Sequence, residues 1–182
     1  DRTRGLVLVD GEAPLAAFYC ANSGGHTDTT DTAWGFPSSL PAVADPLLNE
    51  HTAPLAPDDL AGWLSARPDS YSAHPDYSSR SAYRWQLWVP RDEIERRLDG
   101  GDSLGSLRAL VPGPRGVSGR VRELRVLGTA GELALRGDAI RWRMGGLRSN
   151  LFTVQPKLGG DGLPESFLFT GGGWGHGVGL DQ

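Results

Sequence analysis

Apolar and polar side chains alternate most regularly from the middle of the chain onward. Residues 81–89 place aromatic or aliphatic side chains at every second position, which predicts a strand with one buried face. Four further segments show a similar pattern and are also predicted to be strands: residues 117–127, 132–136, 151–154 and 166–170. Near the start, residues 4–10 and 13–21 are predicted to pair as a hairpin around Asp10-Gly11, a favoured turn pair.

Helix signals are fewer and shorter than strand signals. Pro90 is predicted to occupy the first position of a helix, with acidic residues in its first turn. Brief helices are also predicted over residues 57–64 and 137–144, the second capped by Asp138. The fold class is therefore α+β: a strand-dominated single domain with few short helices and long Gly/Pro-rich loops.

Composition excludes several classes of protein. The 182 residues suffice for one domain with its own core. No apolar run approaches the ~18 residues of a membrane-spanning helix, so no transmembrane segment is expected in this chain. The net charge of -4 and the single lysine, Lys157, argue against a nucleic-acid partner. A lone cysteine, Cys20, excludes an internal disulfide.

The last twelve residues form the first of two unusual loops. Glycine stands at positions 171, 172, 173, 175, 177 and 179, and the large side chains between them are Trp174 and His176. Glycine loses more backbone entropy on folding than any other residue, so such a run indicates a sharp turn or a close approach. It matches neither glycine-rich phosphate-binding pattern. Two interpretations stay open: a turn with a buried Trp and a satisfied His, or a ligand-binding loop.

The second loop follows the N-terminal hairpin and gathers chemically active side chains. Cys20, His26, Asp28 and Asp31 lie within it. Cysteine and histidine both ligate zinc, but the spacing Cys-x5-His matches no standard zinc pattern. The alternative is a buried free cysteine that packs as a small apolar residue, with the other side chains bonded to the loop backbone.

Both loops, with the segments between them, resemble the motifs of the SpoIID/LytB family. Residues 23–27 (S-G-G-H-T), Trp34 and residues 40–46 (L-P-A-V-A-D-P) resemble its S-G-G-x-T … W … L-x-x-V-x-D-P run. Three later segments resemble further motifs in the family's order: residues 118–120 (S-G-R), 147–152 (L-x-S-x-x-F) and 173–179 (G-W-G-H-G-V-G). The resemblance covers almost all of the chain.

The resemblance implies a bacterial cell-envelope protein outside the cytoplasm, either secreted or anchored through a segment that residues 1–182 do not contain. Stage II sporulation protein D of this family is a lytic transglycosylase that cleaves peptide-stripped peptidoglycan strands, and its relatives enhance peptidoglycan amidases. The residues expected to contact the glycan are His176, Trp174, Ser23, Gly24, Gly25, Trp34, Arg148 and Ser149. Some family members bind zinc beside the S-G-G loop through a Cys and a His, which makes Cys20 and His26 the candidate zinc ligands.

The chain departs from the family pattern in its expected catalytic acid. The family's glutamate lies before the hairpin, on a helix of A-Q-A-V-A-A-R type, and no such stretch occurs in residues 1–182. We therefore expect the core of the domain, truncated at both ends, with the acid N-terminal to Asp1. Asp181 also replaces the family's usual serine. Three functions stay open: a lytic transglycosylase, a non-catalytic glycan-binding amidase enhancer, and a metal-dependent hydrolase that uses Cys20, His26 and His176.

Overall fold

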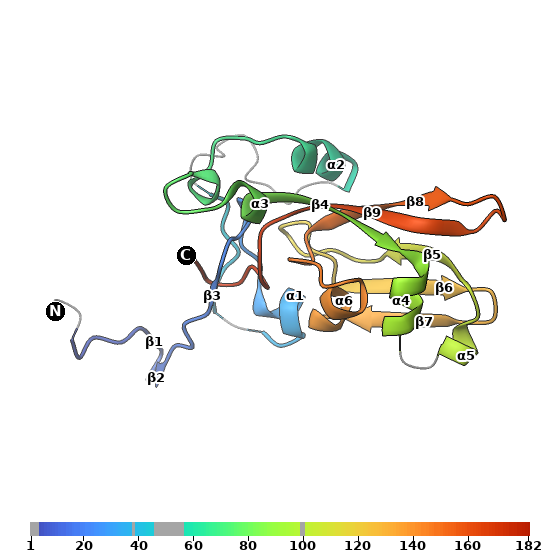
Figure 1. Ribbon diagram of the computed structural model, residues 1–182. Coiled ribbons are helices and arrows are strands. Elements are labelled where there is room, and N and C mark those ends of the chain that lie inside the picture. Colours follow the sequence, from blue (N-terminus) through green and yellow to red (C-terminus); the bar gives the residue numbers. More distant parts are fainter. Residues whose placement is uncertain (1–3, 38, 46–56, 99–100) are drawn as a thin grey trace.

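Two three-stranded antiparallel sheets form the centre of the computed structural model, which describes residues 4–37, 39–45, 57–98 and 101–182 (Figure 1). The first sheet has the order β4-β9-β8, and its strands are Arg84–Pro90, Pro164–Gly172 and Phe152–Leu158. The second has the order β5-β6-β7, and its strands are Leu107–Pro112, Glu123–Gly128 and Glu132–Arg136. The strand-dominated α+β fold class is thereby confirmed.

Side chains from both sheets meet in one apolar core. Phe152 of β8 and Phe169 of β9 pack edge to face, with ring centroids 5.4 Å apart. Burying one side chain of this size stabilises the fold by about 1.5–3 kcal/mol. The other buried strand residues of this core are Trp85, Val89, Leu107, Leu110, Leu124, Val126, Leu135 and Phe167. The alternation seen in the sequence thus supplies the buried face of each sheet.

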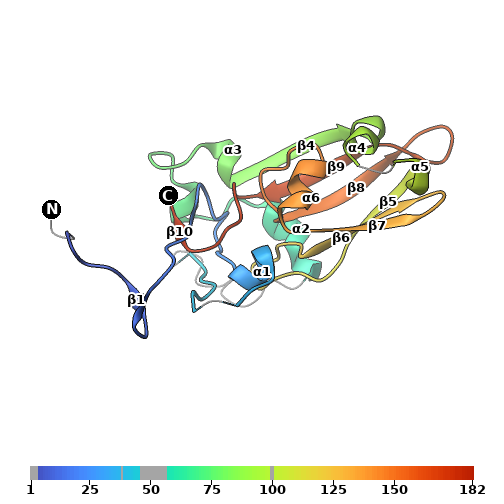
Figure 2. The same ribbon diagram turned by 90° about the horizontal axis from the view of Figure 1, so that it is seen from below.

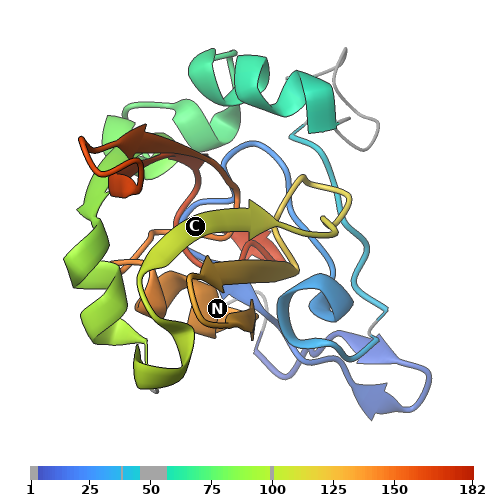
Figure 3. The same ribbon diagram turned by 90° about the vertical axis from the view of Figure 1, so that its right-hand side faces the viewer.

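Short helices close the core on its open sides. Helices α4 (Arg91–Arg97) and α6 (Asp138–Arg143) each insert a fully buried isoleucine into it. Helix α2 (Pro57–Ser65) lies at the top of the molecule in Figure 3 and contributes to a second apolar cluster with Leu151, which directly precedes β8. The core is therefore a helix-covered pair of sheets.

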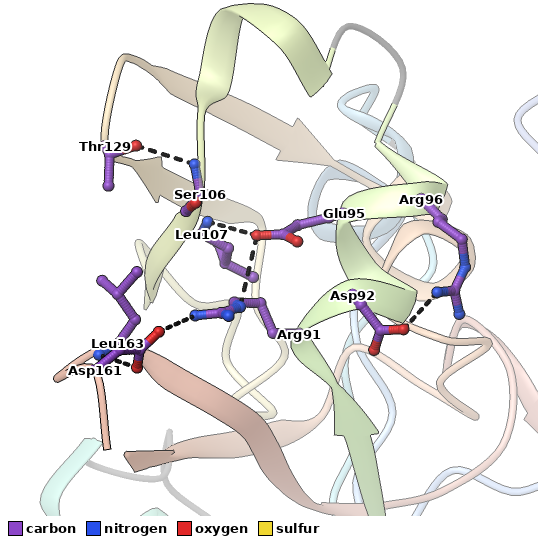
Figure 4. A network of polar contacts seen from close by, with 9 residues as sticks. All are labelled: Arg91, Asp92, Glu95, Arg96, Ser106, Leu107, Thr129, Asp161 and Leu163. Carbon is purple, nitrogen blue, oxygen red and sulfur yellow. Dashed lines mark hydrogen bonds and ion pairs between the residues drawn. The ribbon is translucent and has the colours of Figure 1, made fainter. Parts of the chain in front are cut away.

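A polar network fixes α4 against the ends of the strands (Figure 4). Glu95 accepts a hydrogen bond from the backbone N–H of Leu107 at 2.8 Å, at the start of β5. Arg91 lies 3.9 Å from Glu95 and 3.4 Å from Asp161, which lies in the turn between β8 and β9. These contacts join three segments that are distant in sequence.

Small elements surround the sheets, and the N-terminal hairpin projects away from the main body (Figures 1 and 2). The small elements are β1 (Val9–Asp10), β2 (Ala13–Pro14), β3 (Tyr19–Cys20), α1 (Thr30–Trp34), the 3-10 helix η1 (Tyr71–Ala73), α3 (Arg80–Tyr83), α5 (Gly101–Leu104) and β10 (Leu180–Asp181). Among the described residues between positions 36 and 68, α2 is the one helix or strand.

The predicted N-terminal hairpin is present, but its turn lies one residue later than expected and its strands are shorter. Strands β1 and β2 pair as two-residue strands, and the two residues between them are Gly11 and Glu12. Beyond these strands one more backbone hydrogen bond joins the two arms, from the Leu15 N–H to the Leu8 oxygen at 2.8 Å. Strand β3 instead pairs in parallel with β10, from the opposite end of the chain. This pairing brings the two unusual loops together.

Two predicted strands begin later than expected. Ser79 caps α3 with its side chain, so residues 80–83 are helical and β4 begins at Arg84. Strand β6 begins at Glu123, because the chain before it turns and is closed by a bridge between Arg115 and Val121. The sequence did not indicate β5.

The predicted helices are present, with corrections at their first residues. The helix predicted at 57–64 is confirmed as α2. Pro90 is the N-cap of α4 rather than its first helical residue. Gly137 is the N-cap of α6, and Asp138 lies in the first turn. Pro46, one residue of the family-like 40–46 motif, lies outside the described residues.

Candidate functional site

A buried arginine, Arg120 of the S-G-R segment, organises the two loops. Its side chain is 2% exposed. Its Nη1 donates to the backbone oxygen of His26 at 2.8 Å, and its Nη2 donates to the backbone oxygen of Ser23 at 2.7 Å. A buried charge is costly unless it is paired and hydrogen-bonded, and these carbonyls supply part of that compensation. The S-G-G loop is therefore held from beneath by Arg120.

Asp28 supplies the countercharge. It is fully buried, and the hydroxyl of Ser118 donates a hydrogen bond to its carboxylate. Ser118 in turn accepts from Arg120 Nη1 at 2.9 Å. Burial lowers the pKa of Arg120, and the negative charge of Asp28 opposes that shift. The S-G-R segment and the N-terminal loop thus form one buried polar unit.

Glycine at two positions lets the C-terminal loop pack onto this unit. Gly177 has φ +77°, and a Cβ at this position would overlap the Arg120 guanidinium. The backbone oxygen of Gly177 accepts from the Asp28 N–H at 2.7 Å. A Cβ at Gly24 would lie 2.8 Å from the backbone nitrogen of Gly173, so the S-G-G and G-W-G-H-G loops touch backbone to backbone.

An aromatic cluster lies where these loops meet the helix α1. The Trp34 ring, 36% exposed, has its centroid 4.7 Å from that of His176. Phe18 and Phe36 lie against the same indole, with centroids 5.0 Å and 5.8 Å away. The tertiary structure therefore brings together two of the predicted site residues, Trp34 and His176.

Trp34 also forms part of the wall of a cavity of about 640 Å³. The polar side chains of this cavity form two ion pairs across strands and loops. Arg122 lies 2.6 Å from Asp31, and Arg136 lies 2.6 Å from Glu123. The cavity offers one apolar aromatic face beside carboxylates and guanidinium groups, which is a suitable lining for a polar ligand with an apolar face.

His176 is held as a neutral ring. Its Nδ1 accepts a hydrogen bond from the Val178 N–H at 3.0 Å, so the proton of the neutral ring is on Nε2. Burial lowers the pKa of His176 below its usual value of 6.5, while the charge of Asp138 acts in the opposite direction. A ring with one nitrogen committed to its own loop is suited to packing and hydrogen bonding.

Trp174 lies in a different contact. Its ring is 46% exposed, and the guanidinium carbon of Arg148 lies 4.8 Å from the ring centroid. The backbone of Trp174 is fixed by reciprocal hydrogen bonds with Asn22, of 2.8 Å and 3.1 Å. A second pair of predicted site residues, Trp174 and Arg148, is thus adjacent and accessible.

The remaining predicted glycan contacts are buried and hold the loops. Gly24 and Gly25 are buried in the S-G-G turn. Ser149 is fully buried and donates to the backbone oxygen of Gly172 at 2.6 Å. Ser23, 3% exposed, donates to the Asp181 carboxylate at 2.7 Å. In this structure Gly24, Gly25 and Ser149 position the loops, whereas Ser23 also lines a separate cavity of about 620 Å³.

Cys20 and His26 provide too few donors for a zinc site in the described part of the chain. No three His, Cys, Asp or Glu side chains among those residues form a group that could hold a metal ion. Zinc needs at least three protein ligands. Burial raises the pKa of the Cys20 thiol to about 11, whereas zinc binds the thiolate. The described residues around Cys20 and His26 therefore do not fit a zinc ion.

Several cavity residues were not identified from the sequence as site residues. The same cavity that Trp34 lines is also lined by Arg122, Glu123 and Arg136. They come together there because β6 pairs with β7 and α1 lies beside them. Their one sequence signal was imperfect alternation of arginine with apolar residues, which a half-exposed sheet produces equally well.

Comparison with known proteins places the chain in a family. It belongs to the family described as a domain of unknown function (DUF8618), whose match spans residues 64–179. The matched region includes the S-G-R segment and the G-W-G-H-G loop. No curated protein sequence matches the chain. Among the described residues, no helix has the length and apolar character needed to cross a membrane.

Proposed function

We propose that this member of the DUF8618 family is directed at bacterial cell-wall peptidoglycan and binds its glycan strands at the cavity beside Trp34. The proposal starts from the resemblance to the SpoIID/LytB family. Under this proposal the protein acts at the cell envelope, outside the cytoplasm. Its ligand is the peptide-stripped strand, and a peptidoglycan amidase is a further partner.

The observation that carries the proposal is the position of the Trp34 indole. A pyranose ring has an apolar face of C–H groups and a rim of hydroxyls. The half-exposed indole offers an apolar surface for that face, and it is held in place by the neighbouring rings of His176 and Phe18. The carboxylates of Asp31 and Glu123 line the same cavity and can accept hydrogen bonds from hydroxyls.

Binding is better supported than cleavage. A lytic transglycosylase needs a general acid that protonates the glycosidic oxygen. Asp31 and Glu123 each have an arginine partner, which suits them to accept hydrogen bonds rather than to donate a proton. We assign the catalytic role to neither of them. The described part of the chain thus supports a glycan-binding surface, and the enzymatic step is left to the experiment.

The test is retention of purified, peptide-stripped glycan strands by the protein and by two tryptophan variants. Trp34→Ala is expected to weaken binding about tenfold, since an aromatic contact contributes about 0.5–1.5 kcal/mol beyond its buried area. Trp88→Ala removes a tryptophan that is 54% exposed on β4, away from the cavity, and should bind like the parent. Equal binding by all three proteins, or no binding by the parent, contradicts the proposal.

Mass spectrometry of the same strands after incubation separates the two forms of the function. Anhydro-sugar ends would identify a lytic transglycosylase. Retained strands without new ends would identify a glycan-binding enhancer, whose partner amidase can then be assayed with and without this protein.

A further inference from the structure

A further cavity, of about 450 Å³, is lined by four arginines and no carboxylate. Arg67, Arg80, Arg84 and Arg148 come from the segment after α2, from α3, from β4 and from the loop before β8. The chain as a whole has a net charge of -4, so this concentration of positive charge is local. None of the four forms an ion pair with any described acidic residue, whereas most arginines on α4, α6, β6 and β7 do.

The guanidinium groups are only partly satisfied by the protein. Arg84 is 5% exposed, and its Nη2 is buried without a hydrogen-bond acceptor among the described residues. Its other nitrogens donate to the backbone oxygens of Gly24 and Ala66, at 2.9 Å and 3.2 Å. An unsatisfied buried donor costs about 1–3 kcal/mol, so the protein keeps it at the expense of stability.

Mutual repulsion adds to this cost. Burial is the main reason that the pKa of Arg84 is lowered to about 10; Tyr83 opposes this shift, and the positive charge of Arg67 makes a smaller contribution to it. Two of the other three arginines donate to backbone carbonyls: Arg67 to the Arg80 oxygen at 3.5 Å, and Arg148 to the Ser81 oxygen. An anion in the cavity would offset the local positive charge and accept charge-assisted hydrogen bonds from the accessible guanidinium groups.

The cavity continues to an exposed aromatic surface. Arg148 lines it and also lies 4.8 Å from the centroid of the Trp174 ring. A ligand that places an oxyanion near Arg148 would therefore have an indole face beside it. Sugar acids combine these two features, since a carboxylate is attached directly or by a short arm to a pyranose ring.

We propose that Arg67, Arg80 and Arg148, supported by the buried charge of Arg84, form a subsite for the carboxylate of an acidic sugar that packs on Trp174. The subsite rests on the proposed function, because peptidoglycan supplies such a sugar. Its muramic acid residues carry a lactyl carboxylate, which is an amide while the peptide is attached and a free anion once the peptide is removed. The subsite would therefore select stripped strands by their charge.

The test compares two chemically related ligands. One is the peptide-stripped glycan strand, and the other is the same strand after its carboxylates have been converted to neutral carboxamides. The parent protein is expected to bind the acidic strand at least tenfold more tightly, as charge-assisted hydrogen bonds contribute about 1.5–3 kcal/mol. Arg80→Gln combined with Arg148→Gln should bring the two affinities to within about twofold.

Controls keep the result specific to this cavity. Both substituted arginines are at least partly exposed, and circular dichroism will verify that the variant is folded. Arg108→Gln, on an exposed position of β5, removes a positive charge elsewhere and should keep the preference of the parent. Loss of the preference in Arg108→Gln would overturn the subsite in favour of a general charge effect.

The outcomes distinguish this inference from the proposed function. If the parent binds acidic and neutral strands equally, the subsite is overturned and the glycan-binding function stands. If it binds neither strand, the proposed function fails first. If inorganic phosphate at millimolar concentration displaces the acidic strand but free N-acetylmuramic acid does not, the cavity is a phosphate site and the carboxylate assignment is wrong.

Discussion

The two halves of this molecule are stabilised by different forces. The paired sheets are held by an apolar core in which side chains such as Leu124 and Phe169 are fully buried. The candidate site is carried by the S-G-G loop, the S-G-R segment and the C-terminal G-W-G-H-G loop, which together are called the loop layer. The loop layer is organised around the buried guanidinium of Arg120, the carbonyls that accept its hydrogen bonds and the Asp28 carboxylate. Apolar packing depends mainly on volume, whereas a buried charge depends on every partner atom. The loop layer should therefore be far less tolerant of substitution than the sheets.

The largest expected effect is a difference in the free energy of unfolding between two methionine variants, one in the loop layer and one in the apolar core. Arg120→Met leaves the Ser23 and His26 carbonyls without a donor and Asp28 without its countercharge, which should lower the free energy of unfolding by about 3–5 kcal/mol. Leu124→Met, in the centre of β6, should cost less than about 1.5 kcal/mol, because it nearly conserves volume.

Urea denaturation of both variants measures the difference. Equal shifts of the urea midpoint in Arg120→Met and Leu124→Met would contradict the prediction, since the loop layer would then tolerate substitution as well as the core does. A larger loss of stability in Leu124→Met would show that the core is the less tolerant region.

The next effect separates close packing from backbone conformation. Gly177→Ala places a Cβ against the Arg120 guanidinium at φ +77°, whereas Gly146→Ala places one in open space at φ +79°. The left-handed backbone alone costs about 1–2 kcal/mol. Gly177→Ala should lose a further 1–3 kcal/mol or so through overpacking, and the difference between the two variants isolates that contribution.

Thermal denaturation of the two glycine variants gives the result. Equal melting temperatures would show that the loop moves away from Arg120 at little cost. In that case the close contact between Gly177 and the guanidinium does not determine the stability of the loop layer.

The smallest effect is a pH dependence confined to the loop layer. Burial lowers the pKa of His26 below 6.5, so the unfolded chain takes up this proton first as the pH falls. The stability contributed by the neutral ring is complete above about pH 6.5 and is lost as the pH falls through the folded-state pKa. The parent should therefore be less stable at about pH 5 than at about pH 7.5.

His26→Gln identifies the source of that loss. The amide can still donate to the Thr27 carbonyl, which His26 Nδ1 approaches at 2.7 Å, but it does not titrate. Urea midpoints at both pH values should show a smaller drop in the variant. An equal drop would assign the pH dependence to other groups, among them His176, whose pKa burial also lowers.

The sequence determined the parts of this protein that depend on local pattern. Alternation along residues 81–89 and 166–170 predicts strands because neighbouring side chains in a strand point to opposite faces. It could not give the start of β4, since the cap at Ser79 competes with the strand for the same residues. The glycine-rich end of the chain was recognisable as a place of close approach, but the atoms approached were not.

Only the tertiary structure decided which groups meet. It placed Arg120 under Gly177, Trp34 against His176, and Arg148 beside Trp174. It also gathered the arginines of the arginine-lined cavity from three stretches of the chain, at residues 67, 80–84 and 148. Such contacts join residues far apart along the chain and depend on how whole elements pack. Local periodicity in the sequence cannot predict such contacts. The burial and the charge pairing of side chains in the folded chain identify them.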